Sequence, residues 1–445
     1  MRDERDEMMR KPDDRRMGGP GGPGRPGGPG GPGRPGGPGR PGGPGGPGGP
    51  AMPSKEEVLR RLFEAWRPQA ETETIPLTEA AGRVLAEDVT AKYNIPVVRA
   101  SAMDGIAVKS AAFRDGTPDT TQWKLGQDYV RADTGDDFPD EFDAVIPIEK
   151  AKLLPDGGVE LNIEGEPPIR AGMSVREAGS QIRQGDLVGK RGTVLNALGM
   201  AALGMGGYDQ VKVLRRPKVA FVPTGSELVP VGSELQRGQN FDTNSLMAAE
   251  MIREMGGEPV IRPITRDDKA QLQTVLDSLL KEADIVILNA GTSKGGEDYC
   301  GQMLEQSGAC LFHGVAAVPG RPMSAAILEG KPVLNLSGPA LAAFYGLDWM
   351  VRPMICHYLG IPVPQRLQVR ARLTDALHCP PPMSALSMMF LRQEPDGSYK
   401  ATPLSIRGPH ASRSGSILTA NALYVTTPGE RTHEAGEVIT VELLG

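Results

Sequence analysis

Between residues 217 and 360, short apolar runs alternate with segments whose apolar positions recur every three or four residues. Such runs are typical of buried strands, and the spacing is typical of amphipathic helices. The runs occupy residues 218–223, 259–264, 284–289 and 332–336, and the helical segments occupy 244–255, 269–281, a stretch from about 297, and 338–360. This alternation predicts a doubly wound α/β sheet, with ligands bound beyond the carboxyl ends of its strands.

The segments on either side of this region carry shorter runs and predict smaller units. Residues 91–170 are rich in Pro, Gly and Asp and contain β-like runs such as 144–148, which predicts a small β domain. Ser54, followed by two glutamates, marks the start of a helix with apolar residues at helical spacing. Further helices are expected over 78–85 and 195–205.

These patterns predict a multidomain protein of the α/β plus β class, because 445 residues exceed what one hydrophobic core usually organises. After Pro362, short strands and turns continue to the end of the chain. The expected parts are a discontinuous linker domain, a small β domain, a central doubly wound α/β domain and a C-terminal β domain, over residues 54–90 with 171–215, 91–170, 216–362 and 363–445 respectively.

Residues 18–50 consist of eleven Gly-x-Pro triplets, in which x is Gly or Arg. The strict period of three is compatible with a collagen-like triple helix, but Gly at most x positions raises the entropic cost of ordering such a short run. We therefore favour a flexible, partly polyproline II tail and exclude residues 1–53 from the predicted fold.

The chain is acidic once this tail is set aside. The formal net charge is −6, and residues 1–50 contribute +3, so residues 51–445 carry −9. This balance argues against a general nucleic-acid-binding protein, whose domains usually carry a basic excess. An anionic ligand would therefore be held by local basic residues rather than by the overall field.

The cysteines contain no Cys-x-x-Cys pair and the five histidines are scattered; the four cysteines are Cys300, Cys310, Cys356 and Cys379. This spacing predicts neither a zinc site nor a disulfide framework, and it fits reduced thiols in a cytoplasmic protein. The charged N-terminus lacks the apolar run of a secretory signal. The apolar segment 338–360 contains Asp348 and Arg352, so we expect a buried helix and no membrane span.

Four polar or glycine-rich loops follow the predicted strands of the α/β region, at residues 224–228, 265–268, 290–299 and 337–339. Glycine-rich loops before helix N-termini offer backbone N–H groups to phosphate, and acidic side chains at the same edge suit a hard cation such as Mg²⁺. The alternative is that the acids only cap helices, namely Glu227, Asp268 and Glu297. Because several acids share one predicted edge with glycine-rich loops, we favour a binding site there.

A further candidate carboxylate lies in the segment 99–108, where Asp104 precedes Gly105 between an extended run and an apolar strand start. A carboxylate beside a glycine can reach a metal or ligand without a bulky neighbour in the way. Taken alone, such an Asp-Gly turn is more often structural.

The segment Ser101-Ala-Met-Asp-Gly105 closely resembles a signature of the molybdopterin molybdenumtransferase family, which includes the gephyrin E domain. Similar motifs run in the family's order from about residue 54 to the end of the chain, and they include Thr134-Gly135, Asp143–Glu149, Thr224–Leu228, Phe241–Asn244, Asp267-Asp268, Gly291–Tyr299 and Pro319–Pro322. The combination is highly specific, whereas each motif alone is not.

The resemblance implies a transferase of molybdenum cofactor biosynthesis. Such an enzyme takes adenylylated molybdopterin, cleaves its pyrophosphate link with release of AMP, and inserts molybdate into the dithiolene in a Mg²⁺-dependent reaction. The resemblance also implies a homodimer, with the active cleft between the α/β domain of one subunit and the small β domain of the other, and molybdoenzymes as candidate acceptors.

The same resemblance implies roles for individual residues. Asp104, Glu227 and Asp267 would be catalytic, and together with Asp298 they would hold the metal. The expected cofactor-binding positions are Thr134, Thr224, Gly225, Gly291, Ser293, Lys294, Arg321, Ser337 and Gly338. Within that set, Thr134 would lie across the cleft, and the basic residues with Ser293 would bind anionic oxygens.

Three loops depart from the family's pattern. Residues 336–340 read Leu-Ser-Gly-Pro-Ala in place of Leu-Pro-Gly-Asn-Pro, residues 177–181 lack two acids, and Val318 stands where the family has a lysine. Each charge lost from a buried anion site would cost on the order of 1–3 kcal/mol. A second hypothesis is therefore a non-catalytic or altered-cargo pterin-binding scaffold that delivers cofactor to a partner enzyme.

Overall fold

The computed structural model describes residues 52–266, 268–290, 299–380, 382–404 and 419–444. The Gly-x-Pro tail, which the sequence predicts to be flexible, lies outside these residues.

The central domain is built on a six-stranded sheet in the order β15-β12-β16-β20-β19-β17. Its parallel strands are β12 (Lys218–Thr224), β15 (Glu258–Ile261), β16 (Ile285–Ala290) and β20 (Lys331–Ser337). These four confirm the strands predicted from the apolar runs; β12, β16 and β20 are mostly buried, whereas β15 lies at the edge of the sheet and its residues are exposed or half-buried. The antiparallel strands β19 (Ser324–Leu328) and β17 (Cys310–His313) extend the sheet at one side, and the hydrophobic pattern did not predict them.

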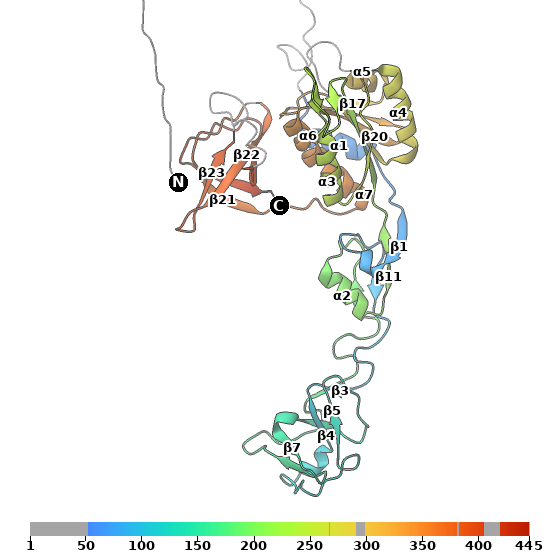
Figure 1. Ribbon diagram of the computed structural model, residues 1–445, viewed down its shortest axis with the longest axis vertical. Helices are drawn as coiled ribbons and strands as arrows, with labels where there is room; N and C mark the ends of the chain where they lie inside the picture. The colour runs from blue at the N-terminus through green and yellow to red at the C-terminus, as the bar shows by residue number, and fades with distance from the viewer. Residues whose placement is uncertain (1–51, 267, 291–298, 381, 405–418, 445) are drawn as a thin grey trace, which may run out of the picture. The chain divides into compact units, whose positions relative to one another are not determined.

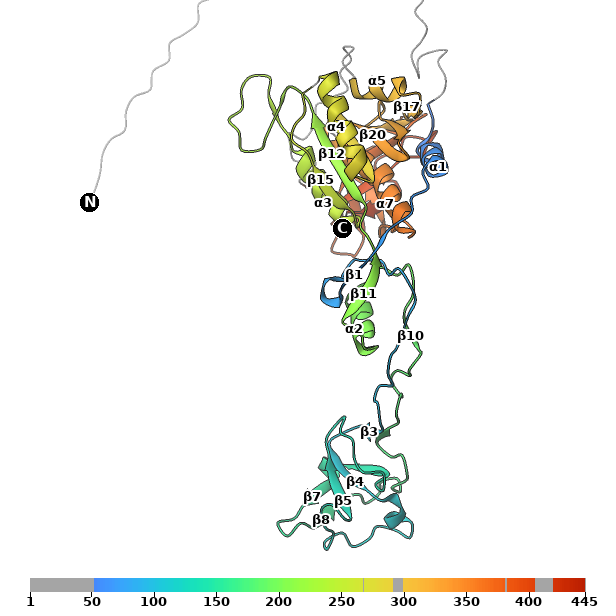
Figure 2. The ribbon, with the colours of Figure 1, turned by 90° about the vertical axis from the view of Figure 1, so that its right-hand side faces the viewer.

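Helices cover both faces of this sheet (Figures 1 and 2). One face packs against α4 (Lys269–Glu282) and α5 (Tyr299–Gln306). The other packs against α1 (Lys55–Ala65), α3 (Asn244–Glu254), α6 (Ala340–Gly346), a π-helical turn (Leu347–Val351) and α7 (Arg352–Leu359). The buried helix expected over 338–360 is thus confirmed as a continuous helical segment, α6 to α7, with a π-helical turn in its middle. In the part of the chain that the structure describes, no helix combines the length and apolar character needed to cross a bilayer.

The first helix begins as its sequence predicts, since the Ser54 side chain accepts the Glu57 backbone N–H at 3.2 Å. Val58 and Leu62 of this helix are buried in the core of the α/β domain. The sequence pattern grouped residues 54–90 with the linker domain, so the packing of this helix is a feature that only the structure reveals.

The linker region pairs two stretches that are distant in the sequence. The strands β1 (Thr72–Pro76) and β11 (Gln210–Leu214) pair with each other, as do β2 (Val89–Thr90) and β10 (Leu187–Gly189). The predicted helix over 195–205 is confirmed as α2 (Ala197–Met205).

The helix predicted over 78–85 is wrong. Only a single 3₁₀ turn forms there, at Leu77–Glu79, and Gly82 then adopts a positive φ of 71°. Val84 and Leu85 form isolated bridges to neighbouring segments, which extended backbone allows and a helix does not. Tertiary pairing therefore overrides local helical spacing at this position.

The small β domain contains β3 (Ala100–Ser101), β4 (Gly105–Val108), β5 (Tyr129–Ala132), β6 (Ala144–Pro147), β7 (Ala151–Leu153), β8 (Val159–Leu161) and β9 (Val175–Arg176). Its central sheet has the order β5-β4-β6. The C-terminal domain contains β21 (Gln368–Leu373), β22 (Ser384–Gln393), β23 (Tyr399–Pro403), β24 (Ala422–Val425) and β25 (Val438–Leu443). These five strands close into a small barrel because β24 also pairs with β22, and β18 (Ala317–Val318) pairs with the first residues of β22.

Gly105 is required by the close approach of β4 and β6, because a Cβ at this position would lie 2.1 Å from the Ile146 backbone oxygen. We expect Gly105→Ala to lower the free energy of unfolding by about 1–3 kcal/mol, measured by chemical denaturation. The matched control is Gly204→Ala in α2, whose Cβ would meet its nearest neighbour at 3.7 Å, and this variant should be as stable as the parent or more so. Equal destabilisation by the two substitutions would contradict the steric argument.

Candidate functional site

The carboxyl ends of three neighbouring parallel strands meet at one edge of the central sheet. Thr224 at the end of β12 is in register with Ala290 at the end of β16, which is in register with Ser337 at the end of β20. Thr265 reaches the same edge through a bridge to Thr224. The loops that follow these strands therefore start side by side, as the strand–helix alternation predicts.

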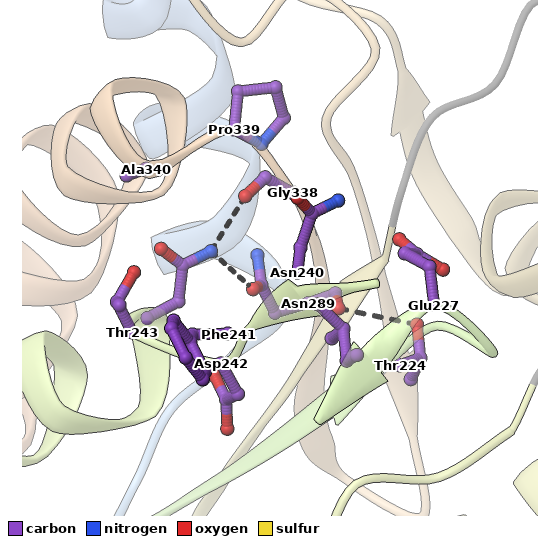
Figure 3. Close-up of a pocket in the computed structure, with 12 residues that line it drawn as sticks. Thr224, Glu227, Asn240, Phe241, Asp242, Thr243, Asn289, Gly338, Pro339 and Ala340 are labelled. Atoms are coloured by element: carbon purple, nitrogen blue, oxygen red, sulfur yellow. Dashed lines mark hydrogen bonds between the residues drawn. The ribbon is translucent and has the colours of Figure 1, made fainter. Parts of the chain in front are cut away.

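A cavity of about 440 Å³ opens at this edge (Figure 3). It lies between the end of β12, the short paired strands β13 (Leu228–Val229) and β14 (Asn240–Phe241), the start of α3, and the loop after β20. Its lining residues are Thr224, Glu227, Leu228, Asn240, Phe241, Asp242, Thr243, Asn244, Asn289, Gly338, Pro339 and Ala340.

The loop after β12 holds the Glu227 carboxylate over a glycine. Gly225 has a positive φ of 154°, and a Cβ there would lie only 2.7 Å from Glu227 Oε2. The Glu227 backbone oxygen accepts the Asn240 N–H at 2.9 Å, which ties this loop to β14. Glu227 is therefore held at the cavity by its own loop, and Gly225 makes room for its carboxylate.

A buried amide pair forms the floor of the cavity. Asn244 Nδ2 donates to Asn289 Oδ1 at 2.8 Å and to the Gly338 backbone oxygen at 2.6 Å. Asn289 Nδ2 donates to the backbone oxygens of Leu336 and Ser337 at 3.2 and 3.0 Å. The Asn289 backbone oxygen accepts the Thr224 hydroxyl at 3.2 Å, as Figure 3 shows. These bonds join α3 and the ends of β12, β16 and β20.

Two acids near this edge serve as helix caps. Asp268 Oδ1 accepts the Gln271 N–H at 2.8 Å at the start of α4, so the capping alternative holds for Asp268. Asp242 Oδ1 accepts the Ser245 N–H at 3.1 Å in the first turn of α3. Glu227 has a different position, because the turn that contains it leads into the strand β13 and no helix begins there.

Asp104 and Thr134 form a second group, on the small β domain. The Thr134 backbone N–H and hydroxyl donate to Asp104 Oδ1 at 2.7 and 2.8 Å. These two hydrogen bonds lower the pKa of Asp104 because they stabilise its charged form. The turn itself is braced by the Ser101 hydroxyl, which donates to the Met103 backbone oxygen at 2.5 Å. The structure thus brings together two residues that the sequence predicts to act at one site.

The remaining predicted site residues have a mixed outcome. Thr224, Gly225, Ser337 and Gly338 lie at the cavity edge, and the buried Ser337 hydroxyl has no hydrogen-bond partner among the described residues. Arg321 is exposed, and its backbone oxygen accepts the Val315 N–H at 2.9 Å. Asp267, Gly291, Ser293, Lys294 and Asp298 lie outside the described residues, so their roles remain predictions.

The described lining of the cavity is acidic. Glu227 and Asp242 are its charged members, and no lysine or arginine occurs among the described lining residues. The site prediction also missed the amides Asn240, Asn244 and Asn289. A sign of Asn289 was present in the sequence, because this amide ends an otherwise apolar buried run at the edge where ligands bind.

Comparisons with known proteins agree over most of the chain. The family model described as "MoeA N-terminal region (domain I and II)" matches residues 54–207, and the model described as "Probable molybdopterin binding domain" matches residues 222–357. The second range contains the whole described lining of the cavity.

Curated relatives include a molybdopterin molybdenumtransferase of Haemophilus influenzae, 27% identical over 417 residues that cover 88% of this chain and 98% of the relative. Molybdopterin molybdenumtransferase 2 of Mycobacterium tuberculosis is 31% identical over 349 residues, which cover 73% of this chain and 84% of the relative. A crystal structure of the molybdopterin biosynthesis protein moeA from Pyrococcus horikoshii is 25% identical with a TM-score of 0.72, covering 88% of this chain and 99% of that chain.

Asn244 offers a direct test of the amide pair. In Asn244→Asp the new carboxylate would face two acceptor oxygens, Asn289 Oδ1 and the Gly338 oxygen, with no proton to donate. We expect the free energy of unfolding to fall by about 1–3 kcal/mol. Asn240→Asp, an exposed position on the same cavity, is the control and should change it by less than about 0.5 kcal/mol. Chemical denaturation of both variants checks this, and an unaltered Asn244→Asp protein would show that the amide pair is dispensable.

Proposed function

Since this chain belongs to the molybdopterin molybdenumtransferase family, we propose that it inserts molybdate into adenylylated molybdopterin and releases AMP. The observation that carries the proposal is the cavity at the carboxyl edge of the central sheet, which holds Glu227 within the range matched by the molybdopterin-binding domain. Crevices at this edge are where open α/β sheets bind ligands.

The donor set of the cavity fits a hard divalent cation. The side chains of Thr224, Glu227 and Asn240 offer oxygen ligands, which suit Mg²⁺ together with substrate phosphates and water. The described lining of the cavity contains two carboxylates, which would repel a bound pyrophosphate. Positive charge from another source must therefore compensate this repulsion. We infer that Mg²⁺ supplies part of it, with Lys294 and Arg321 as further candidates.

The chemistry assigned to this site is cleavage of the pyrophosphate link, with AMP as the leaving group. Glu227 would hold the cation, and Asp104, whose carboxylate is oriented by two hydrogen bonds from Thr134, would act with it from the small β domain. Bound Mg²⁺ would neutralise charge that develops on the phosphate oxygens. Molybdate is a substrate in this scheme, and the dithiolene of molybdopterin receives the molybdenum.

The setting that we propose is a homodimer in the cytoplasm that passes its product to molybdoenzymes. Asp104 and Glu227 lie on different domains, and the family's cleft between two subunits offers a way for both to serve one substrate. A C₂ dimer would then contain two equivalent sites, each built from both chains.

The charge of the acids can be removed with little change in shape. In Asp104→Asn and Glu227→Gln, the rate of AMP release from adenylylated molybdopterin with molybdate and Mg²⁺ should fall at least ~10-fold, about 1.4 kcal/mol in barrier. Asp119→Asn is a matched control, since Asp119 is also exposed and accepts the Thr121 N–H and hydroxyl at 3.0 and 2.6 Å. Glu234→Gln, at an exposed position between β13 and β14, controls for Glu227.

The outcomes separate the two hypotheses. If both acid variants release AMP at the parent rate, these carboxylates have no catalytic role and only stabilise their turns. A parent protein that binds adenylylated molybdopterin but releases no AMP would instead support the scaffold.

Mixing the two inactive variants tests whether the cleft is shared. If Asp104 of one chain and Glu227 of the other belong to the same active site, each heterodimer formed by re-association contains one intact site. A 1:1 mixture should therefore recover about a quarter of the parent activity. A site contained within one chain predicts no recovery, and a monomer in light scattering would likewise overturn the shared cleft.

A further inference from the structure

The C-terminal barrel holds a second cluster of reactive side chains, remote in sequence from the candidate site. Cys379, Glu430 and His433 place a sulfur, a carboxylate oxygen and a ring nitrogen within 4.8 Å of one another. Cys379 is 3% exposed, and the side chains of Glu430 and His433 are 16% and 15% exposed. From these residues we infer a site for a thiophilic divalent cation, Zn²⁺ by its chemistry, independent of the function proposed above.

The backbone brings the three residues together. Leu377 and His433 exchange two hydrogen bonds, from the Leu377 N–H to the His433 oxygen at 2.8 Å and back at 3.0 Å. This bridge fastens the segment before β22, which carries Cys379, to the loop between β24 and β25, which carries Glu430 and His433. The cluster therefore sits where two segments distant in the sequence meet.

The surroundings of His433 are those of a metal-binding imidazole. His433 Nδ1 lies 3.0 Å from Glu437 Oε2, and Glu437 is held by Arg431 through two bonds of 2.9 and 3.0 Å. Histidines that bind metals usually donate one ring N–H to such a carboxylate, which leaves the other nitrogen for the metal. Here that other nitrogen, Nε2, lies 2.7 Å from Glu430 Oε1.

Hydrogen bonds from Thr427 also orient the carboxylate of Glu430. Glu430 Oε2 accepts the Thr427 N–H at 2.6 Å and the Thr427 hydroxyl at 3.0 Å, while Oε1 faces His433 and the Tyr424 hydroxyl. The Cys379 thiol makes a weak hydrogen bond to the Leu377 backbone oxygen at 3.7 Å. A cation entering between these groups would replace the proton shared by Glu430 and His433 and the proton of the thiol.

The donor set selects the ion. One sulfur, one imidazole nitrogen and one carboxylate match Zn²⁺, whereas Mg²⁺ and Ca²⁺ take oxygen ligands. Tetrahedral Zn²⁺ with its usual bond lengths separates such ligand atoms by about 3.3–3.6 Å. His433 Nε2 and Glu430 Oε1 are 2.7 Å apart and all three ligand atoms lie within 4.8 Å of one another, so side-chain shifts of about 1 Å would reach this arrangement. Three protein ligands leave the fourth position to water or to the Tyr424 hydroxyl.

The test uses the full chain, stripped with a chelator and titrated with Co²⁺ in the presence of excess Mg²⁺. We expect a thiolate-to-cobalt charge-transfer band that saturates at about one ion per chain, is displaced by Zn²⁺, and accompanies a rise in melting temperature. Cys379→Ser and His433→Gln should abolish the band. Glu437→Gln should keep it but weaken affinity roughly 10- to 100-fold.

Matched controls come from the central domain, where Cys310 is a half-buried thiol and His313 Nδ1 lies 2.7 Å from Glu305. Cys310→Ser and His313→Gln should leave the band unchanged. No saturable band in the parent, or a band that survives Cys379→Ser, overturns the proposal and leaves the cluster as an ion-pair network. If the His433 variant does not fold, the parent titration and Cys379→Ser still decide the question.

Discussion

The buried amide of Asn289 is the interaction on which the candidate site depends. Its side chain is bonded to α3 and to the end of β20, and its backbone oxygen accepts the hydroxyl at the end of β12. Asn289 is only 2% exposed, and a buried amide that loses a partner costs about 1–3 kcal/mol. The three strand ends and the first turn of α3 are therefore held in one arrangement, and the cavity is the space that this arrangement leaves beside them.

The departures from the family's motifs change the residues that line this cavity more than they change its frame, which is the set of hydrogen bonds that holds the strand ends and α3. Pro339 stands where the family has an asparagine, and it lines the cavity without a side-chain donor or acceptor. Gly338 is kept, and its oxygen is bonded to Asn244. Val318 lies in β18, whose partner is β22 of the barrel, and is not among the described lining residues. The altered loop thus contributes Pro339 and Ala340 to the lining, while the hydrogen bonds of Asn244 hold the frame.

The two acids of the proposed reaction are positioned by different means. Asp104 is fixed by two hydrogen bonds from Thr134, and its neighbour Gly105 permits the close approach of β4 and β6. Glu227 is placed by its own loop, in which the positive φ of Gly225 and the absence of a Cβ leave room for the carboxylate. In both cases a glycine within two residues of the acid permits the local backbone geometry.

The sequence by itself determined the parallel strands and the helices of the central domain, because their apolar periods are long and regular. It also determined the loops at the binding edge, because loops that follow parallel strands share one side of a sheet. Only the tertiary structure decided that Asn244 meets Asn289, that Val84 and Leu85 form β-bridges where a helix was predicted, and that Cys379 lies beside His433. Those features rest on contacts between segments far apart in the chain, and no local pattern of polar and apolar residues encodes which distant partner a side chain will meet.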